Sequence, residues 1–168
     1  YMTACLYWMF PVVRWIFVLS PLMYIFFDME IFMASTSEFV VYTAPYIAAV
    51  VLLQAFFYGR YRWPWMSEIY EYVQSIHLVK SVLGTFIAPR KPTFNVTPKG
   101  FVLDEEKLSS MAAPYFLIFF VLVAALIMAV WRIASGDTNS LLYVVTGWNV
   151  FNLIIAGMAL GAVCDRRE

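Results

Sequence analysis

The chain has 168 residues, of which 63% are hydrophobic and only 13% are charged. Soluble domains carry about 25% charged residues, so this composition excludes a soluble enzyme, a disordered tail and a nucleic-acid-binding protein. Eleven basic residues balance eleven acidic ones, and Cys5 and Cys164 lie too far apart in sequence to suggest a disulfide framework or a metal site. Because the sequence starts with Tyr1 and enters an apolar run almost at once, we expect a piece of a longer protein.

Four apolar runs are long enough to cross a bilayer, which takes about 20 helical residues. They are Leu6–Phe27, Phe39–Tyr58, Met111–Trp131 and Leu141–Val163. The first run is too long for a signal peptide and has no basic segment before it. We therefore predict an all-α membrane protein in three parts. Residues 1–58 form one transmembrane helix pair, 59–110 are cytoplasmic, and 111–168 form a second pair and the start of a linker.

The distribution of basic residues predicts the orientation in the membrane. Nine of the eleven Lys and Arg residues lie between the second and third runs or at the C-terminus. The segment Asp28–Glu38 contains three acids and no basic residue. Since basic residues concentrate in cytoplasmic loops, we expect both chain ends in the cytoplasm and Asp28–Glu38 outside it.

An amphipathic segment follows the second run. Pro64 suits the first turn of a helix, and apolar residues then recur at spacings of three and four. These are Trp65, Ile69, Tyr72, Ile76, Val79, Leu83 and Phe86, with Glu68, Glu71 and Ser75 expected largely on other faces. Charged residues make spanning costly here, so we predict a helix in the membrane interface that ends before Pro89.

The next segment, residues 90–100, combines prolines, a glycine and dense charge, which predicts an exposed loop. One interpretation is a solvated connector. The other is a mobile flap over a substrate, in which Phe94 stacks on a base while Thr97 and Lys99 meet phosphate.

The loop sequence Phe94-Asn95-Val96-Thr97-Pro98-Lys99-Gly100 matches F-x-V-T-x-K-G, the gating-loop motif of bacterial cellulose synthase catalytic subunits. Residues 10–14, 30–32 and 62–71 and the pair Gly147-Trp148 also resemble this family. The resemblance implies a processive family-2 glycosyltransferase that polymerises UDP-glucose into β-1,4-glucan and moves the polymer through a channel formed by its own helices. The motifs D-D, D-x-D, T-E-D and Q-x-x-R-W are missing from this chain, so we expect it to be inactive alone.

The same resemblance implies roles for the loop and for the longer protein. Phe94, Val96 and Thr97 would contact the uridine diphosphate when the loop is inserted, with Lys99 near its phosphates. Mg²⁺ and cyclic-di-GMP are expected for the full-length protein, together with a catalytic domain before this segment and a PilZ domain after it. A periplasmic synthase subunit and a bacterial inner membrane are also implied. No cofactor is expected in the segment itself.

Polar and aromatic side chains within the runs are candidates for lining the glucan channel, because a charge at depth needs a partner or a wet cavity and an aromatic ring can pack on a sugar face. The candidates are Trp8, Arg14, Tyr24, Glu30, Phe32, Tyr46, Gln54, Glu68 and Trp148. Structural roles remain open for all of them. Arg14 could snorkel, Gln54 could form interhelical hydrogen bonds, as could Asn149 and Asn152, and the aromatics could form interfacial belts.

Other functions remain open at this stage. They are a transporter or channel subunit unrelated to polymer synthesis, a structural membrane scaffold, and a synthase of another polysaccharide such as a different β-glucan or a mannan. If the channel interpretation is correct, Arg14, Gln54 and Trp148 should line one gap beside the four spanning helices.

Overall fold

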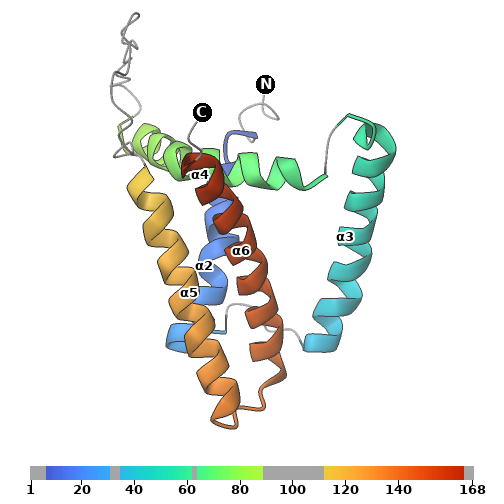
Figure 1. Cartoon of the computed structure of the whole chain (residues 1–168), viewed down its shortest axis with the longest axis vertical. Helices are drawn as coiled ribbons and strands as arrows, with labels where there is room; N and C mark the ends of the chain where they lie inside the picture. The colour runs from blue at the N-terminus through green and yellow to red at the C-terminus, as the bar shows by residue number, and fades with distance from the viewer. Residues whose placement is uncertain (1–6, 31–34, 62–63, 89–111, 165–168) are drawn as a thin grey trace, which may run out of the picture.

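The computed structural model of the protein describes residues 7–30, 35–61, 64–88 and 112–164. These residues form helices α2 (Phe10–Phe27), α3 (Thr36–Tyr58), α4 (Pro64–Ile87), α5 (Ala113–Ala134) and α6 (Ser140–Cys164). Helices α2, α5 and α6 pack into a bundle, α4 lies across one end of it, and α3 stands to one side (Figure 1). Helix α2 begins and α6 ends at the end of the bundle that α4 covers.

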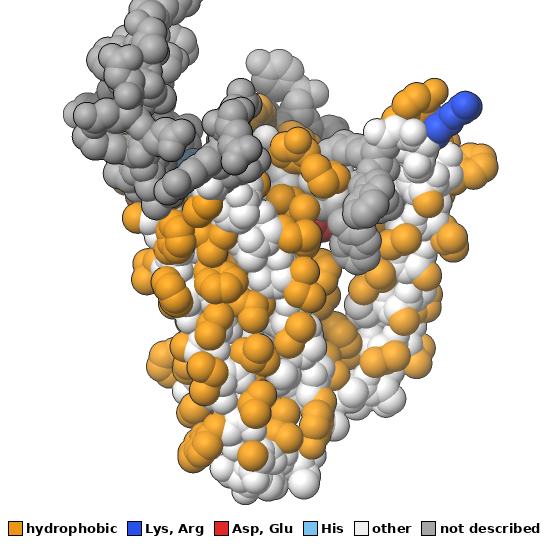
Figure 2. Space-filling view, in the orientation of Figure 1, with side chains coloured by type: hydrophobic (Ala, Val, Ile, Leu, Met, Phe, Trp, Pro, Cys, Tyr) orange, Lys and Arg blue, Asp and Glu red, His pale blue; other side chains and the backbone are white. Residues whose placement is uncertain are grey.

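Four of the helices, α2, α3, α5 and α6, are long and apolar enough to cross a membrane. The shortest has 18 residues, which at about 1.5 Å per residue approaches the thickness of the hydrocarbon core. Large apolar side chains cover the outside of these helices (Figure 2). The predicted all-α membrane architecture is therefore confirmed. Helix α2 begins at Phe10 rather than at Leu6, since Pro11 has no N–H and suits a first helical turn.

Small residues bring α5 and α6 together. Ala125 and Ala129 on α5, and Ala156 and Ala159 on α6, are at most 1% exposed. Because an alanine side chain adds little more than a methyl group, the two backbones approach closely, as is common between membrane helices. These alanines join larger residues of all three bundle helices, among them Ile25 and Leu122, in one continuous core.

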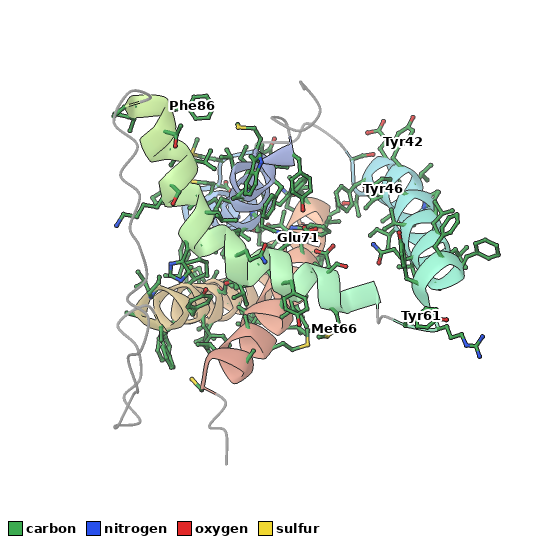
Figure 3. The ribbon with its side chains drawn as sticks, turned by 90° about the horizontal axis from the view of Figure 1, so that it is seen from above. Tyr42, Tyr46, Tyr61, Met66, Glu71 and Phe86 are labelled. Atoms are coloured by element: carbon green, nitrogen blue, oxygen red, sulfur yellow. The ribbon has the colours of Figure 1, made fainter. Side chains whose placement is uncertain are left out.

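Helix α4 has the bounds and the orientation expected of an interface helix. Tyr72 and Ile76 are buried against the bundle and Ile69 is half-buried, as the apolar pattern predicts. The stripe continues past the bundle in the last turns, where Leu83 and Phe86 are 49% and 68% exposed. Figure 3, seen from above, shows Phe86 at the end of α4 that extends past the bundle. The last part of the apolar stripe is thus largely exposed.

Ser75 lies on the buried face of α4, although the sequence pattern placed it elsewhere. Its hydroxyl donates to the Tyr72 carbonyl at 2.8 Å, and its own carbonyl accepts the indole N–H of Trp15 at 3.3 Å. A serine that bonds its own helix backbone satisfies its hydroxyl locally and can be buried. The prediction for Ser75 is therefore wrong, and its small side chain is where α2 meets α4.

Helix α3 is attached to the rest of the molecule mainly through α4 and α6. It begins with a capping box, in which the Ser35 hydroxyl accepts the Glu38 amide and the Glu38 carboxylate accepts the Ser35 amide. None of its residues is buried, and the partly shielded ones recur along one face. They are Thr36, Phe39, Thr43, Val50, Val51 and Gln54. The face of α3 that is turned toward the other helices therefore includes the polar residues Thr36, Thr43 and Gln54.

Candidate functional site

Arg14 joins the bundle to the interface helix through two ion pairs. Its guanidinium donates to Glu68 and, at 2.8 Å, to Glu71, both on α4. The Arg14 side chain is 16% exposed, whereas those of Glu68 and Glu71 are 33% and 49% exposed. Figure 3 shows Glu71 near the centre of the molecule, where α4 crosses the bundle. The three side chains carry a net charge of −1 at this crossing.

Arg14 lies less deep in its helix than the predicted run Leu6–Phe27 implies. It is the fifth residue of α2, close to the helix end that α4 covers. This proximity to the interface lowers the cost of its charge, and two carboxylates balance the rest. Snorkelling to water is therefore not needed, and contact of Arg14 or Glu68 with a glucan stays a prediction.

Trp148, on α6, bonds the backbone of α2. Its indole N–H donates to the carbonyl of Phe17 at 3.1 Å, and its ring packs against Phe17 and Phe151 with centroids 6.2 and 5.5 Å away. Pro21 lies four residues after Phe17 and has no N–H, so α2 cannot supply the usual donor to that carbonyl. The half-buried Trp148 ring is thus held at the boundary between α2 and α6.

The candidates on α3 lie apart from this contact. Gln54 belongs to the partly shielded face, whereas Tyr46 is 70% exposed. The surface is hollowed between α6 and α3, and an acidic side chain is visible at the upper end of the hollow (Figure 2). Arg14, Gln54 and Trp148 come from the three helices α2, α3 and α6, and among the described residues no hydrogen bond or ring contact joins the three to one another.

Tyr24 lies inside the bundle, and its role in a channel stays a prediction. It is 3% exposed, and the Arg132 guanidinium lies 5.5 Å above its ring. Arg132 also donates to the carbonyls of Tyr24 and Ile25 and pairs with Asp28 and Asp137. Sequence analysis missed this use of Arg132. A basic residue at one helix end and acids in two nearby turns were the available signal.

Among the described residues, two titrating groups outside the spans have shifted pKa values. The pKa of Asp137 is lowered, first because its carboxylate accepts the Asn139 amide at 3.1 Å and then because Arg132 donates to it. Burial is the main reason that the pKa of the Tyr72 phenol is raised, with a smaller contribution from Tyr115. Tyr72 is therefore neutral, and Asp137 is charged, at any physiological pH.

Two asparagine side chains of α6 lie inside the bundle. Asn149 is fully buried, and its Nδ2 donates to the Leu122 carbonyl of α5 at 3.1 Å. Asn152 is also buried, with no partner for its Nδ2 among the described residues. Of the two alternatives at Asn149, the interhelical hydrogen bond is therefore the one that the structure contains.

Trp8 lines an open groove beside α4. Glu30 is exposed just after α2. The groove has a volume of about 470 Å³ and is lined by Trp8, Val73, Gln74, His77, Leu78 and Tyr115. His77 packs edge-on against Tyr115, whose hydroxyl donates to the Val73 carbonyl at 2.7 Å.

The predicted nucleotide-contacting residues are not among those that the structure describes. Phe94, Val96, Thr97 and Lys99 of the predicted loop, and Phe32 of the predicted channel, lie outside the described residues. Their proposed roles therefore remain predictions from the sequence.

Comparison with known proteins gives a consistent result along the chain. It is 29% identical over 171 aligned residues to the UDP-forming cellulose synthase catalytic subunit of Pseudomonas fluorescens, an alignment that covers 100% of the chain. It is 30% identical to cellulose synthase 2 of Novacetimonas hansenii over 96% of the chain. It is 35% identical to the UDP-forming cellulose synthase 1 catalytic subunit of Komagataeibacter xylinus over 75% of the chain. No family model matches.

These matches cover only part of each relative. The chain spans 23% of the Pseudomonas protein, 10% of the Novacetimonas protein and 17% of the Komagataeibacter protein. Four helices able to span a membrane agree with a membrane region. The resemblance to bacterial cellulose synthase catalytic subunits is thereby confirmed, and the chain is consistent with a fragment of their membrane region.

Proposed function

We propose that this chain is the translocation-channel and gating-loop portion of a processive, UDP-forming cellulose synthase. The observation that carries the proposal is the position of α4. It lies across the ends of the spanning helices, and the F-x-V-T-x-K-G motif begins at Phe94, seven residues after α4 ends at Ile87. A loop that follows such a helix is tethered next to the membrane surface, where a nucleotide-dependent lid would have to act.

The space beside α3 supports a path for a sugar polymer. Helix α3 stands off from the bundle, and its partly shielded face includes Thr43 and Gln54. Hydroxyl and amide groups can exchange hydrogen bonds with sugar hydroxyls, and the half-buried ring of Trp148 on α6 offers an apolar face. Arg14 and its two carboxylates would lie at the entrance of this path, beneath α4.

The chemistry of the motif suits a uridine diphosphate. An aromatic ring such as Phe94 can stack on a base, and Thr97 and Lys99 can donate hydrogen bonds to phosphate oxygens. Donors and a cation aimed at a diphosphate stabilise the charge that develops on it as the glycosyl group leaves. UDP-glucose, the growing glucan and the bilayer are therefore the proposed partners.

Further components are proposed only for the full-length protein. Mg²⁺, cyclic-di-GMP, a catalytic domain, a PilZ domain and a periplasmic subunit belong to this group. Within the described residues, no group of three His, Cys, Asp or Glu side chains could hold a metal ion. The proposed location is a bacterial inner membrane with both ends of this segment in the cytoplasm, because the basic residues concentrate on that side.

The test is polymer synthesis by the full-length synthase in inner-membrane vesicles. We expect Phe94→Ala to lower glucose incorporation from UDP-glucose about tenfold or more, because the nucleotide contact is lost. The matched control is Phe86→Ala, which removes the same ring from an exposed position on α4. Unchanged turnover in Phe94→Ala would refute the gating role.

The same vesicles distinguish the alternative functions. Polymer made only from another sugar nucleotide would indicate a synthase of a different polysaccharide. Failure to make polymer from any sugar nucleotide, with intact solute transport, would indicate a transporter or channel subunit.

A further inference from the structure

Helix α2 contains Pro21 in its interior, and the backbone carbonyl that Pro21 leaves without a helical donor is bonded by a residue of α6. In a regular helix, the carbonyl of Phe17 would accept the amide N–H of residue 21. Pro21 has no such N–H, so this carbonyl loses its helical donor inside a segment that crosses the bilayer. An unsatisfied carbonyl in hydrocarbon is costly, and prolines are tolerated in spanning helices when a neighbouring helix supplies the missing donor.

Trp148 supplies that donor. Its indole N–H lies 3.1 Å from the Phe17 carbonyl oxygen, across the contact between α6 and α2. The indole group has one donor and no acceptor, so this bond uses its full hydrogen-bonding capacity. The hydrogen bond fixes one edge of the ring, and the tilted contacts with Phe17 and Phe151 restrict rotation of the ring about that bond.

We propose that Pro21 is a positioning residue for Trp148: it frees the Phe17 carbonyl to bind the indole N–H and so sets how the Trp148 ring is presented at the boundary between α2 and α6. The inference rests on the proposed function for its consequence, since a ring held in one orientation offers a constant surface to sugar rings passing along α6. Because its polar atom is already bonded, the ring presents only an apolar face, which allows successive sugars to slide without a strong hydrogen bond to break.

Pro45 provides a matched control within the same chain. It also interrupts a spanning helix, α3, and also removes the donor to a carbonyl four residues earlier. That carbonyl belongs to Val41, which is 64% exposed, and no described side chain is bonded to it. Substitution of Pro45 therefore changes helix propensity in the same way but should leave Trp148 unaffected.

The test uses the full-length synthase in lipid nanodiscs with ¹⁵N-labelled tryptophan, in which Trp148→Phe identifies the Trp148 indole resonance. We expect the indole N–H of Trp148 to be protected from hydrogen exchange in the unmodified protein. In Pro21→Ala the restored amide competes for the Phe17 carbonyl, and exchange of the Trp148 indole should be about 3- to 10-fold faster. Pro45→Ala should leave the exchange rate unchanged.

Further variants keep the proposal falsifiable. Pro21→Ser also restores the amide and serves if the alanine variant does not fold. If the Trp148 indole exchanges freely in the unmodified protein, or if its rate is the same in folded Pro21→Ala and Pro21→Ser, the positioning role is refuted. This measurement does not depend on catalysis.

Polymer synthesis separates failure of this inference from failure of the proposed function. We expect Pro21→Ala and Trp148→Phe each to slow chain elongation, and the double variant to be no slower than Trp148→Phe alone, because both act through one bond. A changed exchange rate with unchanged synthesis would uphold the positioning of Trp148 and refute its contact with the polymer. Additive slowing in the double variant would refute the common mechanism.

Discussion

Nη2 of Arg132, near the end of α5, lies 2.8 Å from Oδ1 of Asp28, the residue that caps α2. Asp28 has a positive φ of 57°, and as α2 ends its amide donates to the Tyr24 carbonyl while the Met29 amide donates to the Met23 carbonyl. The same guanidinium donates to carbonyls of that last turn and to Asp137. One side chain thus joins the end of α2, the end of α5 and the turn into α6.

Arg132→Lys tests this joint. A lysine keeps the charge, but its compact ammonium cannot replace the fork of donors that binds two carboxylates and two carbonyls. We expect a loss of about 1–3 kcal/mol in the free energy of unfolding, measured by thermal or denaturant unfolding of the full-length protein in detergent. Arg60→Lys, at an exposed position after α3, is the matched control and should be neutral. Equal effects in the two variants would contradict the role of Arg132.

The ion pairs of Arg14 predict that charge reversal rescues a damaging substitution. Arg14→Glu places a third carboxylate next to Glu68 and Glu71, and we expect it to destabilise the contact of α2 with α4 by about 2 kcal/mol or more. Adding Glu68→Arg should restore about half of the loss or more. Thermal unfolding at low and high salt measures both effects. Absence of rescue would show that the ion pairs do not hold α4.

Asn149 predicts a modest but specific packing energy. We expect Asn149→Ala to cost about 0.6 kcal/mol, the average for hydrogen bonds between membrane helices, and at most about 1.7 kcal/mol. Asn152→Ala removes a similar volume but no described hydrogen bond from Nδ2, so it should cost less in the same unfolding measurement. A larger loss in Asn152→Ala would contradict the assignment of Asn149 to the contact between α5 and α6.

Asp137 predicts acid sensitivity of the turn between α5 and α6. Its pKa in the folded protein lies below the ordinary value of 3.8, so its stabilising effect is complete above that value and is lost as the pH falls through the lowered pKa. We therefore expect the difference in melting temperature between the unmodified protein and Asp137→Asn to disappear as the pH drops below about 3.8. A difference that persists or grows in acid would contradict this sign.

Hydrophobic run length alone predicted the four spans, because crossing a bilayer requires helices of one narrow range of lengths. Alternating apolar spacing and Pro64 likewise predicted α4. Contacts between particular side chains on different helices could not be predicted in this way. Nothing in the sequence shows that the carbonyl freed by Pro21 is met by Trp148, 131 residues away in sequence, or that Arg14 pairs with α4. Such partners depend on how helices pack, which periodicity does not encode.

Burial also separated candidates that looked alike in sequence. Tyr24 and Tyr46 are both tyrosines within spans, but the first is 3% exposed and the second 70% exposed. Helix α2 is covered by α4, α5 and α6, whereas α3 stands apart. Their different surroundings follow from the order in which the helices pack, and neither hydropathy nor aromatic content distinguishes them.

The central claim is that the segment around Thr97 acts as a nucleotide-responsive loop on the cytoplasmic side of a polymer channel. The most direct test is the accessibility of Thr97→Cys in a full-length synthase from which Cys5 and Cys164 have been removed. We predict that a membrane-impermeant maleimide labels this cysteine in inverted inner-membrane vesicles but not in intact cells or spheroplasts, and that UDP reduces the labelling. Labelling from the periplasmic side would contradict the account.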